Sequence, residues 1–575
     1  METQKKFPLF LAVLQGEESI NFALGVLFHQ NSHRLNTQAI LSTSFLKNIV
    51  CESSYKEQKF ELGPKNFQLV QSKLVNRENL LKISNCLFFK NLILSNEEIE
   101  KSLSDEEHDE IFSELGHYDI DSNLFNASTS LVISLFENYS SVFIPIVLEC
   151  YKFLQQNSDI QNIEQFKHSL LKKECLYHVV GLGSFQLYDH IDFSGWFTNQ
   201  LVKELEDSSH PQVENERKML KRRIIWMIGK WVSKIGKDLR IKLYPLLLHF
   251  LSNKQNNKIL RFETAKSLTS LISDYDFVLE DFFSYVNPTL NLFLSLINEM
   301  ENPDTITYLF SQFELILEQL GGHLSGELDN LFQNVVILWK KFFEEETIQS
   351  SLLRIVCQIV KRSPSATKYY SFLLPLIKHS TFVENKASIY LMEDGLDLWV
   401  RILKIAPELN QEFVSLYSHV FPIISSSFSH YKSCVSITEA YLLLGGKPFL
   451  STYIKDILNF FDCVIGDTKD KVSIALLNLL DTFVLLHSSS FFPSALPLFQ
   501  KILGLFLNQD ESIIHRVQLL YVLYRFISVA PNVFFDLIKV CSQNQNPFIL
   551  FSTFLEKTFE FVSFFFFSNF FLLDG

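Results

Sequence analysis

Apolar residues recur along nearly the whole chain at the spacing of amphipathic helices. One helix face is shared by Leu260, Thr264, Ala265, Leu268, Leu271 and Ile272, at positions i, i+4, i+5, i+8, i+11 and i+12. The charged residues Arg261, Glu263 and Lys266 take the other side of the same helix. No long stretch alternates strictly between apolar and polar positions, so no strands are expected. The pattern predicts an all-α protein.

One local device repeats along the chain: a charged residue stands near the start of an apolar helix, just after a short polar break. It occurs at Arg261, Arg354, Lys471 and Arg516. The first two lie 93 positions apart, which is two repeats of about 46, and the last two lie 45 apart. Both spacings match the period of roughly 40–47 residues in HEAT and armadillo helix pairs. Helices this short do not fold alone but stack on their neighbours. The sequence therefore predicts an α-solenoid in which this charged residue bonds neighbouring helix ends.

The composition agrees with stacked helix pairs. Of the 575 residues 47% are hydrophobic, and 18 Gly and 16 Pro are fewer turn residues than a β-rich fold needs. The 56 Phe residues fit bulky filling between helix layers, and also an A/T-rich genome. The 8 Cys residues are scattered and form no CxxC pair, so reduced thiols in a cytosolic or nuclear protein are expected.

The chain is acidic, with a net charge of −13 and a pI of about 5.7. Such a surface repels phosphate backbones, so nucleic acid is not expected as a direct partner. It suits basic partner proteins, although plain solubility explains it nearly as well. Residues 95–122 concentrate the charge and indicate an acidic loop or mobile insert between helices, either simply solvated or a lure for basic protein segments. The candidate binding residues are Glu97, Glu98, Glu100, Asp105, Glu106, Glu107, Asp109 and Glu110.

No motif for catalysis or cofactor binding stands out. HExxH, the Walker phosphate loop and GxSxG are absent, and Gly181 with Gly183 lacks the third glycine of a dinucleotide loop. His108 and His117 lie among carboxylates but match no metal-ligand spacing, so they are expected to be solvated. We therefore expect no enzyme activity, no cofactor and no metal.

Several charged and aromatic residues have both a structural and a functional interpretation. Glu393 and Asp394 fit surface charge at a helix start. The basic run 221–223 resembles a short nuclear-localisation patch, but its helix favours a solvated or acid-paired face. The tryptophans fit core anchors first, and some of them also fit binding hot spots on an inner face. These tryptophans are Trp196, Trp226, Trp231, Trp339 and Trp399.

The C-terminal stretch is Phe-rich, reading FVSFFFFSNFFLL at 561–573. Its 13 residues fall short of the roughly 20 that span a bilayer, so no membrane span is expected. A buried last helix and a translated T-rich non-coding stretch, which would not be native, both fit better than a tail anchor.

Several ordered blocks agree in sequence and spacing with one family. They are YHVVGLG (177–183), DFSGWF (192–197), LKRRIIWMIGKW (220–231), LRFETAKSL (260–268), DYDF (274–277) and LMEDGLDLW (391–399). In these blocks the chain resembles the importin-β (karyopherin) superfamily, specifically the importin-11-like nuclear transport receptors. The repeat-signature residues are Arg222, Arg223, Trp226, Trp231, Arg261, Asp394 and Trp399.

The resemblance implies a right-handed superhelix of HEAT repeats. We expect HEAT-like repeats at 1–94, the acidic loop or insert at 95–122, a HEAT solenoid at 123–545 and the Phe-rich tail at 546–575. The chain resembles the central portion of a receptor, without the family's N-terminal Ran-binding repeats and without its C-terminal end. Weak or absent binding of Ran-GTP is therefore expected.

The family implies a function and a set of partners. It implies a monomeric receptor that carries cargo proteins through the nuclear pore into the nucleus, binds Phe-Gly nucleoporins and releases cargo to Ran-GTP. Such a receptor shuttles between cytoplasm and nucleus and visits the nuclear envelope. The sequence does not distinguish import from export or name the cargo. The alternative is a HEAT-repeat scaffold of a static multiprotein complex, which would need neither Ran nor nucleoporins.

Overall fold

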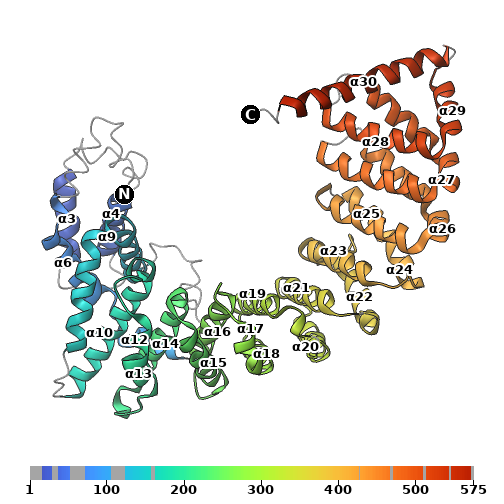
Figure 1. The fold of residues 1–575 in the computed structure, drawn as a ribbon. Helices are drawn as coiled ribbons and strands as arrows, with labels where there is room; N and C mark the ends of the chain where they lie inside the picture. Colours follow the sequence, from blue (N-terminus) through green and yellow to red (C-terminus); the bar gives the residue numbers. More distant parts are fainter. Residues whose placement is uncertain are drawn as a thin grey trace. The chain divides into compact units, whose positions relative to one another are not determined.

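Over the described residues, the computed structural model is built of α-helices with short 3₁₀ and π segments, and it divides into residues 1–323 and residues 324–575 (Figure 1). It describes residues 16–28, 37–51, 72–104, 123–156, 162–324, 326–364, 366–426, 428–465, 470–508, 513–542 and 546–571. No residue in these ranges lies in a strand, and the all-α solenoid class is confirmed.

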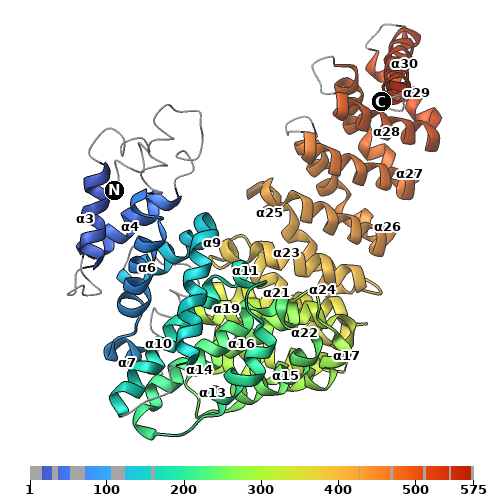
Figure 2. The same ribbon diagram turned by 60° about the vertical axis from the view of Figure 1, so that its left-hand side comes forward.

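The first unit builds up from helix pairs, which Figure 2 shows from a second side. Its helices are α3 (Gly16–Phe28), α4 (Thr37–Cys51), α6 (Arg77–Cys86), α7 (Asn96–Leu103), α9 (Leu124–Gln156), α10 (Ile163–Leu182), α11 (Ser184–Leu187), α12 (Phe193–Trp196), α13 (Val202–Glu206), α14 (Glu214–Lys230), α15 (Lys237–Ser252), α16 (Lys258–Ser273), α17 (Leu279–Phe282), α18 (Val286–Glu299) and α19 (Pro303–Leu320). The second helices of successive pairs contact one another in the order α10, α14, α16 and α19. We call these four helices the second-helix row of the first unit.

The second unit repeats this arrangement. Its helices are α20 (Leu328–Lys341), α21 (Glu346–Arg362), α22 (Tyr370–Thr381), α23 (Ser388–Ile405), α24 (Gln411–Leu416), α25 (Val420–Ser426), α26 (Tyr431–Val464), α27 (Asp470–Leu507), α28 (Ile513–Val529), α29 (Pro531–Cys541) and α30 (Pro547–Phe571). Here the second-helix row runs through α21, α23, α26, α27 and α28, each in contact with the next. Gly446 divides α26, because its φ of 52° and ψ of −143° suit glycine and few other residues.

Local sequence explains where many helices begin and what holds them together. Asn76, Asn162, Asn257, Asn302 and Asn410 cap α6, α10, α16, α19 and α24, each accepting a hydrogen bond from a first-turn backbone N–H. Between the layers, phenylalanine rings fill the core. The ring of Phe526 in α28 lies 4.5 Å from that of Phe492 and 4.3 Å from that of Phe499. The high phenylalanine content therefore includes core filling, as predicted.

The start of the acidic segment is helical rather than a loop. Ser95 and Glu98 form a capping box at the start of α7, which ends at Leu103. Ile99 is buried and packs with Leu171 of α10 and Met219 of α14. The helix was not predicted because the segment contains many carboxylates. Its position is fixed by two apolar residues, 99 and 103, which pack against the core. Residues 105–122 lie outside the described ranges.

Two apolar helices bear on the question of a membrane. Among the described residues, one helix stretch, Leu124–Phe153 of α9, is long and apolar enough to cross a bilayer, and half of it is buried in the protein. It contacts α4, α6 and α10 and contains Pro145. In α30, one face of the first part of the Phe-rich tail packs against the core: Phe554 is buried, with its ring 5.5 Å from that of Phe506 and 5.6 Å from that of Phe534, whereas Phe548 and Phe559 are exposed.

Candidate protein-interaction surface

Arg261, in the first turn of α16, joins three helices. Its side chain is buried, and its Nε donates to the backbone oxygen of Leu251 near the end of α15 at 3.0 Å. Its terminal nitrogens donate to the carboxylate of Glu299, the last residue of α18. These hydrogen bonds are the main reason why the pKa of Glu299 falls to about 2. The predicted bonding of neighbouring helix ends is confirmed at this residue.

Arg516 repeats the arrangement in the second unit. Its Nε donates to the backbone oxygen of Phe506, near the end of α27, at 3.1 Å. Both this bond and that of Arg261 span ten residues of sequence. A long guanidinium arm thus reaches the last turn of the preceding helix and supplies a donor to a carbonyl that has no partner within its own helix. Arg354 was also expected near a helix start, and that was wrong, because it lies in the middle of α21 and donates to Ser350 and Ser351 of the same helix. The side chain of Lys471 lies outside the described residues.

Ion pairs also join neighbouring helices within the two second-helix rows. They are Glu174–Arg223 between α10 and α14, Arg354–Asp394 between α21 and α23, and Asp481–Arg525 between α27 and α28. The first pair is buried, with 2.7 Å between nitrogen and oxygen and exposed fractions of 2% and 7% for its side chains. The other two are half-buried. Each pair ties one repeat to the next, so these charges serve stacking.

The signature residues in these ties differ partly from expectation. Arg223 is acid-paired, as predicted, and also lies 4.8 Å from the ring of Trp226, so it is not an exposed localisation patch. Its neighbour Arg222 is half-buried. Asp394 was expected on the surface at a helix start, and that was wrong. It lies inside α23, which begins at Ser388, and accepts a hydrogen bond from Ser350 of α21.

The five tryptophans are core residues, and none is more than 8% exposed. The alternative that some of them line an exposed binding face is therefore wrong. Trp226 also explains Gly181, since a Cβ on Gly181 would lie 2.0 Å from the indole ring. This glycine permits close helix packing, and no nucleotide loop is formed there. Trp399 donates to the hydroxyl of Tyr441 at 3.3 Å, joining α23 to α26.

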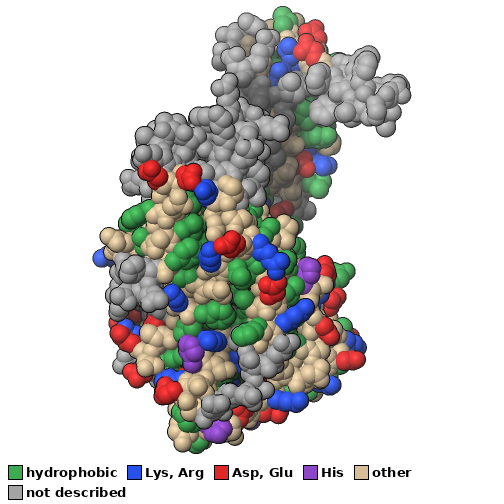
Figure 3. Space-filling model, turned by 90° about the vertical axis from the view of Figure 1, so that its left-hand side faces the viewer, with side chains coloured by type: hydrophobic (Ala, Val, Ile, Leu, Met, Phe, Trp, Pro, Cys, Tyr) green, Lys and Arg blue, Asp and Glu red, His purple; other side chains and the backbone are tan. Residues whose placement is uncertain are grey.

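Three of the predicted acidic binding residues are described, and two of them have structural partners. Glu97 pairs with Lys101 at 3.2 Å, and Glu98 caps α7. Glu100 is exposed and has no side-chain partner in the described part of the chain. The remaining candidates, Asp105, Glu106, Glu107, Asp109 and Glu110, and the two histidines His108 and His117, lie outside it. On the face of the first unit in Figure 3, acidic and basic side chains are interspersed with apolar ones.

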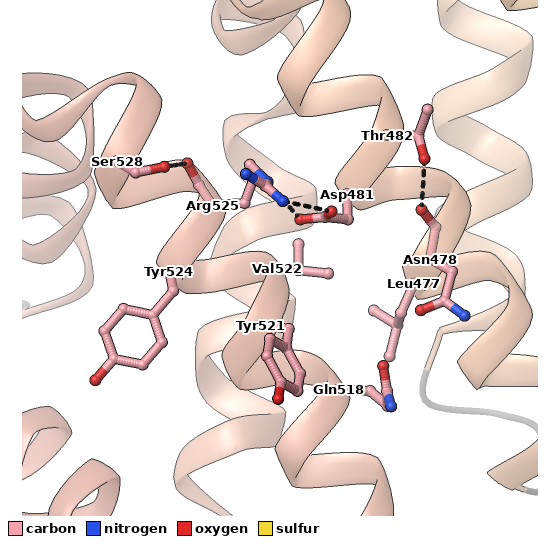
Figure 4. Close-up of a pocket in the computed structure, with 10 residues that line it drawn as sticks. All are labelled: Leu477, Asn478, Asp481, Thr482, Gln518, Tyr521, Val522, Tyr524, Arg525 and Ser528. Atoms are coloured by element: carbon pink, nitrogen blue, oxygen red, sulfur yellow. Dashed lines mark hydrogen bonds and ion pairs between the residues drawn. The ribbon is translucent and has the colours of Figure 1, made fainter.

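A groove of about 730 Å³ lies between α27 and α28 (Figure 4). Its lining consists of Leu477, Asn478, Asp481, Thr482, Gln518, Tyr521, Val522, Tyr524, Arg525 and Ser528. Asp481 and Arg525 form a two-point ion pair in it, at 3.0 and 3.2 Å. Tyr521 is 64% and Tyr524 43% exposed.

This groove was not predicted from the sequence pattern. The signal in the sequence was weak: two tyrosines one helical turn apart on a largely apolar helix, and two amides, Asn478 and Gln518, 40 positions apart. That separation is about one repeat, and both amides line the same groove from neighbouring helices.

Comparisons with known proteins agree on one family. A family model described as "Importin-11-like, TPR repeats" matches residues 350–570. Importin-11 of Homo sapiens is 30% identical over 333 residues, which cover 58% of this chain and 33% of that protein. The importin beta-like protein kap113 of Schizosaccharomyces pombe is 20% identical over 424 residues, covering 72% of this chain and 41% of that protein. The matched part of the chain thus covers about a third of the length of Importin-11.

Solved structures share the fold. Lph2, described as a bidirectional nuclear transport receptor of S. cerevisiae, superimposes with a TM-score of 0.80 at 15% identity, covering 94% of this chain and 56% of that one. Yeast Kap95p, in a structure with RanGDP, gives a TM-score of 0.63 at 12% identity, covering 98% and 62%. At such identities the likeness concerns the fold alone. The family-model match continues to residue 570, beyond the blocks that carried the resemblance in the sequence.

Proposed function

We propose that the chain is an importin-11-like karyopherin that acts in nuclear transport, binding cargo proteins on its helical repeats and carrying them through the nuclear pore into the nucleus. The observation that carries this proposal is the 30% identity with Importin-11 over 333 residues. The likeness of the fold to that of a nuclear transport receptor supports it.

The described geometry suits a protein that binds other proteins. Helix pairs tied by Arg261, Arg516 and the row ion pairs present long, repetitive surfaces, over which many weak contacts add up. The relatives are named as importins rather than enzymes, so we infer a binding role without catalysis, cofactor or metal.

The partners follow from the family. We infer cargo that is folded or basic, Phe-Gly nucleoporins, and Ran, whose GTP form would favour a receptor conformation that cargo does not bind. Kap95p is described with RanGDP, and Kap121p, at a TM-score of 0.51 and 11% identity, with RanGTP. We also infer that the protein is a monomer and that it shuttles between cytoplasm and nucleus, visiting the nuclear envelope. Charge complementarity to the acidic chain would speed the encounter with basic cargo.

The test is affinity purification of the full chain from cell extract, with and without GTP-locked Ran, read by mass spectrometry. Co-purified cargo and nucleoporins are the expected result, and release of that cargo by GTP-locked Ran would mean that the chain engages Ran in spite of the weak binding expected from its sequence. Cargo and nucleoporins that Ran leaves in place would contradict Ran-dependent release. A fixed set of partners without nucleoporins would contradict the transport role and favour the static scaffold.

A further inference from the structure

The groove between α27 and α28 has the size and lining of a binding site. Its volume of about 730 Å³ falls within the roughly 300–1,000 Å³ of typical ligand sites. It lies within the second unit, on two helices that belong to the same row. It is accessible from solvent, since the lining residues Asn478 and Ser528 are exposed. A ligand could therefore enter it.

Two amide side chains in the groove are available to a ligand. Asn478 of α27 is exposed and Gln518 of α28 is half-buried, and neither side chain has a hydrogen-bond partner in the described part of the chain. An amide offers one acceptor oxygen and a two-hydrogen donor. This combination matches a peptide unit, whose N–H and C=O are both unpaired in an extended segment. The amides therefore suit recognition of a peptide backbone.

Two tyrosines supply the apolar contact. Tyr521 and Tyr524 are 64% and 43% exposed, and their hydroxyl groups have no partner in the described residues. Rings of this kind give large contact area at a low cost in conformational entropy, and tyrosine is enriched at binding hot spots. Both rings belong to α28, which is held in place by the core contacts of Phe526 with α27.

The charges of the groove neutralise each other. Asp481 and Arg525 meet in a two-point geometry that satisfies the carboxylate and two guanidinium nitrogens. A basic ligand would have to compete with Arg525 for Asp481, and an acidic ligand with Asp481 for Arg525. The groove therefore favours a ligand segment that carries no charge where it crosses this pair.

We propose that this groove binds an extended, uncharged peptide segment of a partner protein, with Asn478 and Gln518 holding the backbone and Tyr521 and Tyr524 contacting its apolar side chains. Identifying the partner as transport cargo rests on the proposed function, whereas the binding itself does not.

The experiment selects a phage-displayed library of random peptides on the purified full chain and measures the affinity of enriched peptides by fluorescence anisotropy. We expect uncharged peptides with apolar side chains. Tyr521→Ala and Asn478→Ala should each weaken their binding about tenfold, while Tyr521→Phe should retain it. Tyr390→Ala is the matched control, because Tyr390 is 62% exposed on α23, outside the groove, and should change affinity less than about twofold. Since no net charge is engaged, affinity should change little between low and high salt.

Three outcomes would overturn the proposal. Peptides that bind the Tyr521→Ala and Asn478→Ala variants as tightly as the original chain would place binding elsewhere. Basic peptides whose binding fails in Asp481→Asn would make the groove an acidic site. The absence of any enrichment would mean that the groove takes no peptide. Because neither Ran nor nucleoporins take part, peptide binding without cargo transport would leave this proposal standing and refute only the proposed function.

Discussion

Replacing Arg261 by alanine should loosen the junction of α15, α16 and α18. The arginine side chain is buried and is the main partner of the Glu299 carboxylate, and it also satisfies the Leu251 carbonyl. A pKa of about 2 instead of 4.5 corresponds to about 3 kcal/mol, since one pKa unit is worth about 1.4 kcal/mol. Ser295 and Lys254 contribute part of this. The loss through the variant should therefore be about 2 kcal/mol of local stability.

The same ion pair predicts a dependence on pH with a definite sign. Folding lowers the pKa of Glu299, so its stabilisation is fully present above the ordinary value of 4.5 and is lost as the pH falls towards about 2. In the original chain the junction should open progressively over this window. In Arg261→Ala the dependence should be much weaker, because the carboxylate has lost its main partner.

Hydrogen exchange read by mass spectrometry suits this test, because a repeat protein opens locally rather than in one step. Peptides covering 237–299 should exchange about 30-fold faster in the variant when exchange is limited by the opening equilibrium, which corresponds to about 2 kcal/mol. The matched control is Arg354→Ala. The Arg354 side chain is 36% exposed and its guanidinium lies 3.8 Å from Asp394, so the loss should be below about 1 kcal/mol. Equal acceleration at both sites, or an unchanged pH dependence in Arg261→Ala, would refute the reasoning.

Three further predictions concern packing and thiols. Arg223→Ala should lower the free energy of unfolding by about 3–5 kcal/mol, measured with urea, because it leaves Glu174 buried without its ion-pair partner. Replacing both residues by Met should recover most of this loss. An equal loss in the double variant would contradict the prediction. Gly181→Ala should lower the free energy of unfolding by about 1–3 kcal/mol, because the new Cβ clashes with the buried indole of Trp226. Gly25→Ala is the control and should be neutral or stabilising, because there is open space around Gly25. Equal effects of the two variants would argue against the clash. Iodoacetamide should alkylate the exposed thiol of Cys51 before the buried thiols, whose pKa burial raises, and a uniform rate in peptide mass spectrometry would contradict this.

The fold could be predicted because its causes are local. Helical periodicity recurs in every repeat, and the spacing of Arg261 to its successors gave the repeat length before any contact was known. The role of Arg261 and Arg516 was also foreseeable, because a charged residue at the start of an apolar helix can reach the end of the preceding helix. The residues joined by these bonds are only ten positions apart, so they are close in the sequence as well as in space.

Contacts between repeats could not be predicted in the same way. Asp394 looked like surface charge because its partners, Ser350 and Arg354, lie about one repeat away, and periodicity alone does not fix which turn faces which. The helix α7 was missed because its carboxylates dominate the composition, whereas two apolar side chains decide its position. The groove was not predicted because its walls come from two helices of neighbouring repeats, and periodicity does not show which of their turns face each other.

The way these repeats are tied together limits what their second-helix rows can recognise. Charged residues at Arg223, Arg354 and Arg525 are already paired across neighbouring helices, so a ligand that engaged them would weaken the stacking that shapes its own site. Recognition beside such ties therefore falls to uncharged groups, as the amides and tyrosines between α27 and α28 illustrate. Any attraction of basic partners would then come from carboxylates that take part in no ion pair or helix cap, of which Glu100 is a described example. A protein built this way would separate long-range attraction from short-range fit, placing them on different residues.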